Sequence, residues 1–200
     1  DAMTGSNSNT VVGYASLSAD TLGSSSTALG TGVLRNQNFA TATVTHNTAV
    51  GNSAGNLITT GVQNTIIGSL AGDALTDADH NVVVGYAALS SDTLGSKSIA
   101  IGHAALQVQN FVTATDAYNV AVGYNAGQQI TTGQYNTLIG ALAGDGLTDA
   151  ANSTAIGYSA LSAASAGTSC TAIGLSALAL ATGNENTALG VNAGNVITSG

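Results

Sequence analysis

The sequence predicts an all-β fold, a parallel β-solenoid built of roughly 17-residue coils, on three observations. A five-residue motif, made of a polar residue, three mostly apolar residues and a glycine, occurs eleven times. Seven of the ten steps between successive copies have the same length, as from Gly51 to Gly68 and from Gly68 to Gly85, while two are longer and one is shorter. The apolar part of the motif is short and non-polar at neighbouring positions in every copy. A fixed short period is the sequence signature of stacked structural repeats.

The glycine is the constant residue of the motif, and the first residue is most often Asn. The motif glycines are Gly13, Gly30, Gly51, Gly68, Gly85, Gly102, Gly123, Gly140, Gly157, Gly174 and Gly190. Asn suits the turn that leads into a strand, because its side chain bonds nearby backbone. Glycine at a fixed position indicates a backbone conformation or a close contact that other residues do not allow.

The three residues before each glycine are predicted to form a strand. Side chains alternate between the two faces of a strand. The residue directly before glycine is branched and apolar in all eleven copies, and the residue before that is also always apolar. Both faces are therefore predicted to be buried, as in stacked parallel sheets. We expect the branched residues to fill the coil, and the other residues, frequently Ala, to pack closely against another copy of the chain.

The rest of each coil is predicted to hold a tight corner, a second short strand and a polar return loop. The second segment centres on a small residue three positions after glycine, followed by Leu or Gly according to coil type. The two longer coils carry insertions at residues 37–46 and 109–118. Insertions in repeat arrays usually form surface loops.

Residues 1–200 are interpreted as a single repeat array that belongs to a longer fibre. Residues 9–80 and 81–152 align without a gap, with 45 identities in 72 positions, and residues 153–200 begin a shortened third block. Each coil of such an array contacts mainly its neighbours, so the length is not restricted as in a globular domain.

Composition excludes several classes of function. Only 6% of residues are charged, the net charge is −8, and Arg35 and Lys97 are the only basic residues. Nucleic-acid binding needs a basic patch, so no nucleic-acid partner is expected. No stretch approaches the 18 or more apolar residues of a membrane span, so this segment is not expected to be membrane-embedded. Cys170 is the only cysteine, which excludes an intrachain disulfide.

Residues with metal-binding side chains give weak signals. His46 and His80 precede motif Asn residues and are expected at solvated corners, and neither has ligand partners at a suitable spacing. Asp73, Asp77 and Asp79 cluster, and the next block repeats part of this pattern. Oxygen-rich loops can hold calcium. Turn formation is the favoured role for these aspartates, and calcium between coils or chains stays open.

No catalytic, cofactor-binding or metal-ligating residue is assigned, no cofactor is expected, and the chain is not expected to be an enzyme. Cys170 takes the Asn position of its motif and is expected to be a buried small residue. Tyr14, Tyr86 and Tyr158 recur at equivalent positions of the three blocks, directly after glycine. They are expected either to pack between coils or to form a stripe that binds carbohydrate or protein.

The motif resembles the repeat of the head domains of trimeric autotransporter adhesins. The clearest matches are Ser-Thr-Ala-Ile-Gly at residues 153–157 and Asn-Thr-Ala-Val-Gly at residues 47–51. Residues 119–127 are also similar to the shafts of phage tail fibres. The resemblance implies a left-handed parallel β-roll and an intertwined homotrimer. It also implies an extracellular location on a bacterial surface or a phage virion, and adhesion to a host-cell surface, glycan or extracellular-matrix ligand.

The leading hypothesis is therefore a structural and adhesive fibre segment. An ice-binding β-solenoid is the alternative, because the third residue before glycine is Thr in eight copies. Those Thr residues share a face with the branched residues expected in the core, which counts against it. An enzyme would need a cluster of catalytic side chains in a groove, and none is evident.

Overall fold

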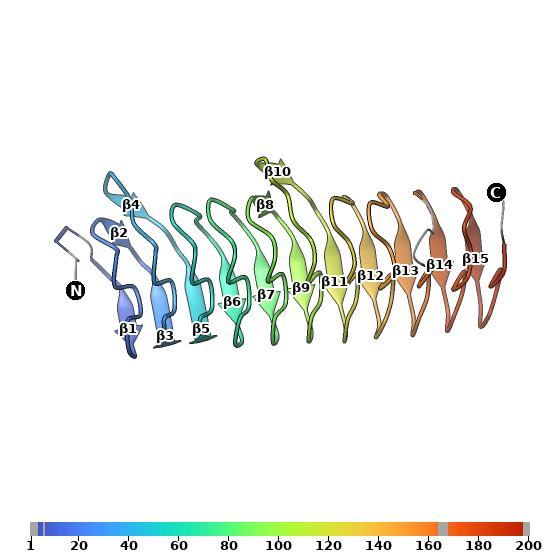
Figure 1. The fold of residues 1–200 in the computed structure, drawn as a ribbon, viewed down its shortest axis with the longest axis horizontal. Coiled ribbons are helices and arrows are strands. Elements are labelled where there is room, and N and C mark those ends of the chain that lie inside the picture. The colour runs from blue at the N-terminus through green and yellow to red at the C-terminus, as the bar shows by residue number, and fades with distance from the viewer. Residues whose placement is uncertain (1–3, 6, 164–167, 198–200) are drawn as a thin grey trace.

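The computed structural model describes residues 4–5, 7–163 and 168–197, which form one β-solenoid without any helix. Eleven short strands, one from each motif, pair in parallel into a single sheet that runs the length of the rod (Figure 1). The strands are β1 (Thr10–Val12), β3 (Thr27–Thr31), β5 (Thr48–Asn52), β6 (Thr65–Ile67), β7 (Val82–Val84), β9 (Ile99–Ile101), β11 (Val120–Val122), β12 (Thr137–Ile139), β13 (Thr154–Ile156), β14 (Thr171–Ile173) and β15 (Thr187–Leu189). The predicted parallel β-solenoid with its coil length is confirmed.

The register of the sheet places equivalent motif residues side by side. Val11 pairs with Ala28, and Ala28 pairs with Ala49, although the second step crosses one of the longer coils. Neighbouring strands lie about 4.8 Å apart, so ten steps give a rod of roughly 50 Å. Side chains at each motif position therefore form a straight column along the rod.

The two insertions form small parallel ladders on the side of the rod away from the main sheet (Figure 1). Strand β2 (Gly23–Ser24) pairs with β4 (Thr43–Val44), and β8 (Gly95–Ser96) pairs with β10 (Thr115–Asp116). Val112 is 80% exposed near the tip of the second insertion. The prediction that both insertions are surface loops is confirmed.

A buried hydrogen-bond network fixes the base of each insertion. Gln37 Nε2 donates to Asp20 Oδ2 at 2.8 Å, and its Oε1 accepts from Asn47 Nδ2 at 2.8 Å. Gln109 makes the equivalent bonds to Asp92 and Asn119. The side chains of this network are buried and paired with one another, as the cost of burying polar groups requires.

The prediction that the branched residues face the core and the Ala column faces outward is wrong. The frequent Ala column fills the interior, with Ala49 and Ala100 fully buried, whereas Val12, Leu29 and Leu189 of the branched column are 57%, 46% and 76% exposed. The reason lies outside the strands. A large side chain from the turn after each glycine already occupies the interior, so the strand contributes mostly small residues.

The two coil types fill the interior from different turn positions. In one type, Leu stands four residues after the motif glycine, as Leu34 does after Gly30, and is buried. In the other type this position is Gly, and Ile or Leu three residues later enters the core. A Cβ at Gly55 would lie 3.0 Å from Leu34 Cδ2 and 3.1 Å from Ile58 Cδ1. One bulky turn residue per coil is therefore what the volume allows.

The motif Asn residues form a ladder inside the rod at the predicted corner. Asn64 Nδ2 donates to the Ala78 carbonyl at 2.8 Å, and Asn64 Oδ1 accepts from the Asn81 backbone N–H at 2.9 Å. Asn64 thus closes its own coil and binds the next one, and Asn47, Asn81, Asn119 and Asn136 make the same pair of bonds. Ser26, Ser98, Ser153 and Cys170 take the same place in four coils.

The motif glycines also form a column, in which each coil lies close against the next. Gly85 has φ 142°, and a Cβ there would overlap the Gly102 carbonyl oxygen. Gly190 has the similar φ of 124°, but a Cβ there would meet only Ala193 Cβ, at 3.9 Å. Both positions therefore require a positive φ, but only at Gly85 would a Cβ clash with the backbone of the next coil.

We predict that Gly85→Ala destabilises the rod far more than Gly190→Ala. Both substitutions force Ala into an unfavourable φ, at about 1–3 kcal/mol, and only Gly85→Ala adds a backbone clash. Thermal unfolding followed by circular dichroism measures the difference. Equal losses in Tm would mean that the close coil-to-coil contact has no energetic role.

Candidate interaction surfaces

The outer face of the eleven-stranded sheet is an uncharged, largely apolar surface. We define the outer sheet face as the residues one and three positions before each motif glycine. Its branched column is Val12, Leu29, Val50, Ile67, Val84, Ile101, Val122, Ile139, Ile156, Ile173 and Leu189. Along the centre of the rod Ile67 is 40% and Ile139 is 39% exposed, and Val84, Ile101 and Val122 between them are partly buried. The adjoining column is Thr in eight coils and Val or Ile in three.

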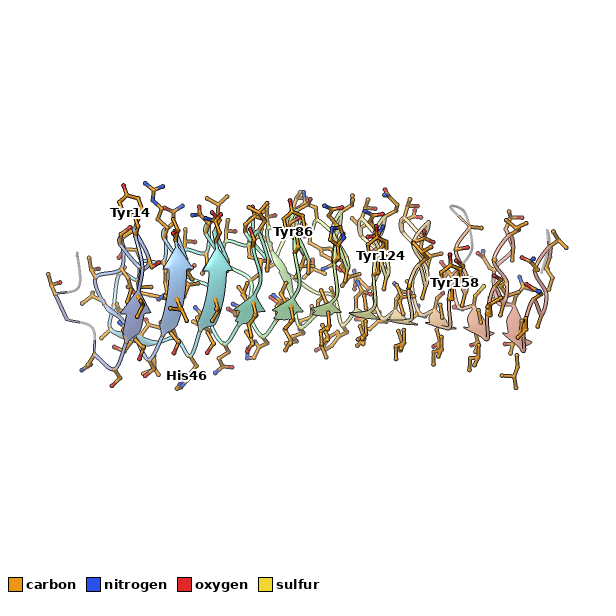
Figure 2. All side chains as sticks on the ribbon, turned by 90° about the horizontal axis from the view of Figure 1, so that it is seen from below. Tyr14, His46, Tyr86, Tyr124 and Tyr158 are labelled. Carbon is orange, nitrogen blue, oxygen red and sulfur yellow. The ribbon has the colours of Figure 1, made fainter. Side chains whose placement is uncertain are left out.

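A second surface, the aromatic column, is formed by the residues that come directly after the motif glycines in the sequence. Tyr14, Tyr86, Tyr124 and Tyr158 lie along one edge of the rod, and His46 lies on the opposite edge (Figure 2). The imidazole of His103 stacks between two Tyr rings, with centroids 5.3 Å from Tyr86 and 5.2 Å from Tyr124. Tyr86 therefore packs on the neighbouring coil, as one interpretation of the sequence expects, and is still 53% exposed.

The aromatic stack is specific to the second block, residues 81–152. His103 and Tyr124 correspond to Thr31 and Asn52 in the first block. Tyr14, Tyr86 and Tyr158 could be predicted from the sequence because they recur, whereas His103 and Tyr124 do not recur and were not predicted as part of this surface. The signal that was available is the set of positions at which the two blocks differ.

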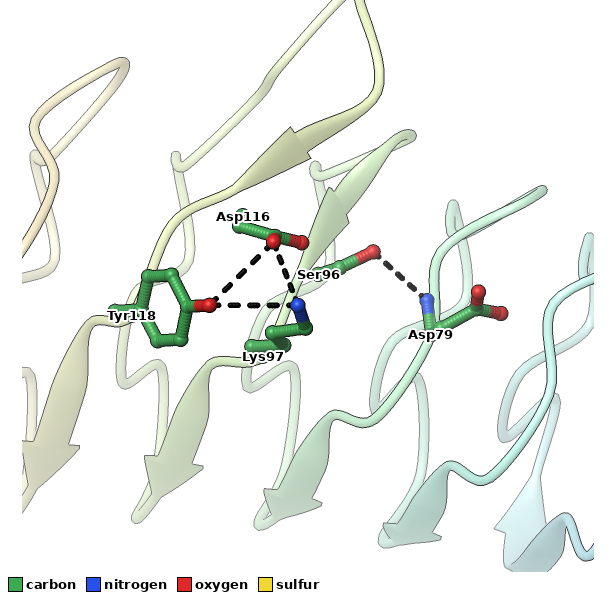
Figure 3. Close-up of polar contacts among 5 residues, drawn as sticks. All are labelled: Asp79, Ser96, Lys97, Asp116 and Tyr118. Atoms are coloured by element: carbon green, nitrogen blue, oxygen red, sulfur yellow. Dashed lines mark hydrogen bonds and ion pairs between the residues drawn. The ribbon is translucent and has the colours of Figure 1, made fainter.

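A third surface lies beside the second insertion, where Lys97, Asp116, Tyr118 and Tyr135 form one cluster. Figure 3 shows the contacts among Lys97, Asp116 and Tyr118. Lys97 Nζ donates to Asp116 Oδ2 at 2.6 Å and to Tyr118 Oη at 3.3 Å, and it lies 5.4 Å from the Tyr118 ring centroid. Tyr118 stacks on Tyr135 at 5.6 Å. The hydrogen bond to Asp116 raises the pKa of Lys97, so the ammonium is charged at neutral pH.

All four residues of this cluster differ from their counterparts in the first block. The counterparts are Ser25, Val44, His46 and Gln63. This cluster, too, was not predicted from the sequence. It spans three successive coils, so its members are distant in the sequence and share no local motif.

The histidines are exposed and scattered. His46 and His80 lie at coil corners with φ of 51° and 60°, as expected, and His103 belongs to the aromatic column. Within the described residues, no three His, Cys, Asp or Glu side chains are grouped closely enough to hold a metal ion.

The loop aspartates point to different partners. Asp77 Oδ1 accepts from Thr60 Oγ1 at 2.6 Å, and Asp79 Oδ1 accepts from the Val62 N–H at 2.7 Å. Asp73 and its counterpart Asp145 each have one buried carboxylate oxygen without a hydrogen-bond partner. Burial raises the pKa of both carboxyl groups above 3.8. These aspartates do not converge on one site. Asp77 and Asp79 each bind a residue 17 positions earlier, so they join neighbouring coils, and the predicted role in turn formation stays a prediction.

Cys170 is fully buried, as predicted. Its thiol lies 3.5 Å from the Gly183 carbonyl oxygen, and its backbone N–H donates to Ser153 Oγ at 3.2 Å. The thiol continues the Asn ladder as a weak donor.

Comparison with known proteins gives no relative: no protein-family model, curated protein or solved structure matches this chain. A membrane-crossing helix is also not found among the described residues.

We predict that Asp73→Asn and Asp145→Asn stabilise the fold at pH 7. A raised folded pKa means that ionisation is harder in the folded state, so the penalty grows as pH rises from 3.8 to the folded pKa and is complete above it. Solvent screens these half-buried groups, so we expect a gain of at most about 1 kcal/mol. The gain should vanish below the ordinary pKa, where both states are protonated.

Unfolding measured between pH 3 and pH 8 tests this prediction, with the exposed Asp77→Asn as the control. Destabilisation by Asp73→Asn at pH 7, together with a Tm that falls when a chelator is added to the unmodified chain, would instead indicate bound calcium.

Proposed function

We propose that this chain is a segment of a structural and adhesive extracellular fibre, in which three copies pack through their outer sheet faces. The observation that carries the proposal is the outer sheet face itself, a branched apolar column, exposed or partly exposed at every coil, that follows the whole rod without a charged residue. The motif resemblance to trimeric adhesin heads and phage tail fibres supports the threefold arrangement and a place on a bacterial surface or a virion.

The size of the outer sheet face supports burial against a partner. Two columns along eleven strands cover roughly 10 Å by 50 Å. This uncharged face of roughly 500 Å², which includes the Thr column, is comparable in size with the largest apolar patches on monomeric proteins, and such patches are often functional. Burial of the face in an assembly would give about 25 cal/mol for each Å² of apolar surface removed from water.

A copy of the same chain is the partner that the face fits best. Its ridges repeat at one strand spacing, so another identical rod offers ridges and grooves at the same spacing. The face has no charge for a charged partner to recognise. With the apolar faces turned toward a shared axis, the insertions and the Lys97 cluster are available for adhesion to a host-cell surface, a glycan or an extracellular-matrix ligand.

Analytical ultracentrifugation tests the assembly. We expect a mass three times that of the 19.3 kDa chain and an elongated shape. Ile67→Asp and Ile139→Asp should each dissociate the trimer, because a carboxylate buried in an apolar interface lacks a partner. Val112→Asp, on an exposed loop, is the matched control and should leave the mass unchanged. A compact monomeric mass for the unmodified chain would reject the proposal.

Ice binding is the second candidate. One finding removes the argument that the sequence analysis raised against it. The Thr column points outward with the branched column, rather than into the core, so it forms a regular uncharged row on a sheet. An ice-binding face has to be free in solution, so this candidate requires a monomer.

We predict that a monomeric chain with this function shows thermal hysteresis, and that Thr65→Lys and Thr137→Lys reduce it strongly because a long charged side chain interrupts the row. Nanolitre osmometry measures the effect. No hysteresis in the unmodified monomer would exclude ice binding.

A further inference from the structure

The aromatic column lacks one ring between two exposed tyrosines. Tyr86, His103 and Tyr124 stack on successive coils, one ring per coil. On the next coil the same position holds Ala141, and on the coil after that it holds Tyr158. Tyr124 and Tyr158 are each 55% exposed, and both lie on the same edge of the rod (Figure 2). We call the space over Ala141, between Tyr124 and Tyr158, the ring slot.

The width of the ring slot follows from the sheet register. Val122 pairs with Ile139, and Ile139 pairs with Ile156, so the residues after the three glycines continue one column. Two coil steps of about 4.8 Å separate Tyr124 from Tyr158 by roughly 10 Å. The rings already stacked in this column have centroids 5.2 and 5.3 Å apart. One additional six-membered ring therefore fits over Ala141 at the spacing that the column already uses.

We propose that the ring slot binds a pyranose ring of a neutral sugar. The two flat sides of a pyranose present C–H groups, which pack on the faces of aromatic rings. Its hydroxyl groups lie around the edge, where the open slot leaves them in water. A fully aromatic guest would gain more from a closed, dry pocket than from walls that are half-exposed.

Charge selects a neutral sugar. The chain has a net charge of −8 and only two basic residues, Arg35 and Lys97. Neither lies on the three coils that form the ring slot, so no cation is present to bind a carboxylate or phosphate. Asn125 Oδ1 lies 3.4 Å from His103 Nδ1, which connects this polar group to the ring stack.

An incomplete version of the same site lies 72 residues earlier, where the first block meets the second. Its corresponding residues are Asn52, Ser69 and Tyr86, so one aromatic wall is missing. The biological role of the ring slot depends on the proposed function, an adhesive fibre, and the slot would give that fibre a neutral sugar as its ligand. The binding itself needs only the three coils in this chain.

Saturation-transfer difference NMR tests the proposal with three probes, the methyl pyranosides of glucose, galactose and mannose. We expect transfer to the ring protons of at least one probe. Tyr124→Asn, which copies the first block, should reduce the transfer at least fivefold. Ala141→Tyr should do the same by filling the slot. Tyr14→Asn and Ser69→Tyr are the matched controls, in the same column but outside the slot, and should leave the transfer unchanged.

No transfer to any of the three probes, or equal transfer in the unmodified chain and Ala141→Tyr, would overturn the ring slot. The native mass of the same samples separates this result from the fibre proposal. A monomer that binds sugar through Tyr124 would support the slot and reject the trimer, and a trimer without transfer would do the reverse.

Discussion

Each coil can lie against the next only because the motif glycine has no side chain. The carbonyl of one glycine occupies the space that a Cβ on the preceding glycine would need, as at Gly85 and Gly102. This contact repeats through the stack, next to the buried ladder in which Asn64 binds Asn81. Together they hold every motif in register, and the register aligns all other side chains into columns. The outer sheet face and the aromatic column exist because of that alignment.

Short-range signals made most of the fold predictable from sequence. Glycine and Asn at fixed positions located all eleven strands, the corners and both insertions, because these features depend on a few neighbouring residues. These signals could not show which face of each strand points into the core. Alternation separates Ala28 from Leu29 onto opposite faces, but it does not say which face is inside. In this coil the deciding residue is Leu34, which fills the core from the turn, so that the small Ala28 and not Leu29 faces inward.

The candidate surfaces were less predictable because their residues come together across coils. Tyr86, His103 and Tyr124 belong to three successive coils of unequal length, so only an exact register shows that all three rings stack. Residues that repeat in every block are mainly those of the core and the turns, so a search for repeats misses residues on the surface. The Lys97 cluster and the aromatic stack use positions at which the two blocks differ, since a shared core leaves the surface free to vary.

The long repeat block makes the length of the rod adjustable in fixed increments. Residues 9–80 and 81–152 each supply four coils and end at equivalent corners, His80 and Asn152. A recombination that joins His80 to Ser153 would remove four coils, or roughly 19 Å of rod. The new junction would carry the same pattern of Asn, glycine and core residues as the one it replaces. Recombination between the blocks would therefore change the length of the rod while the core residues at the junction pack as before.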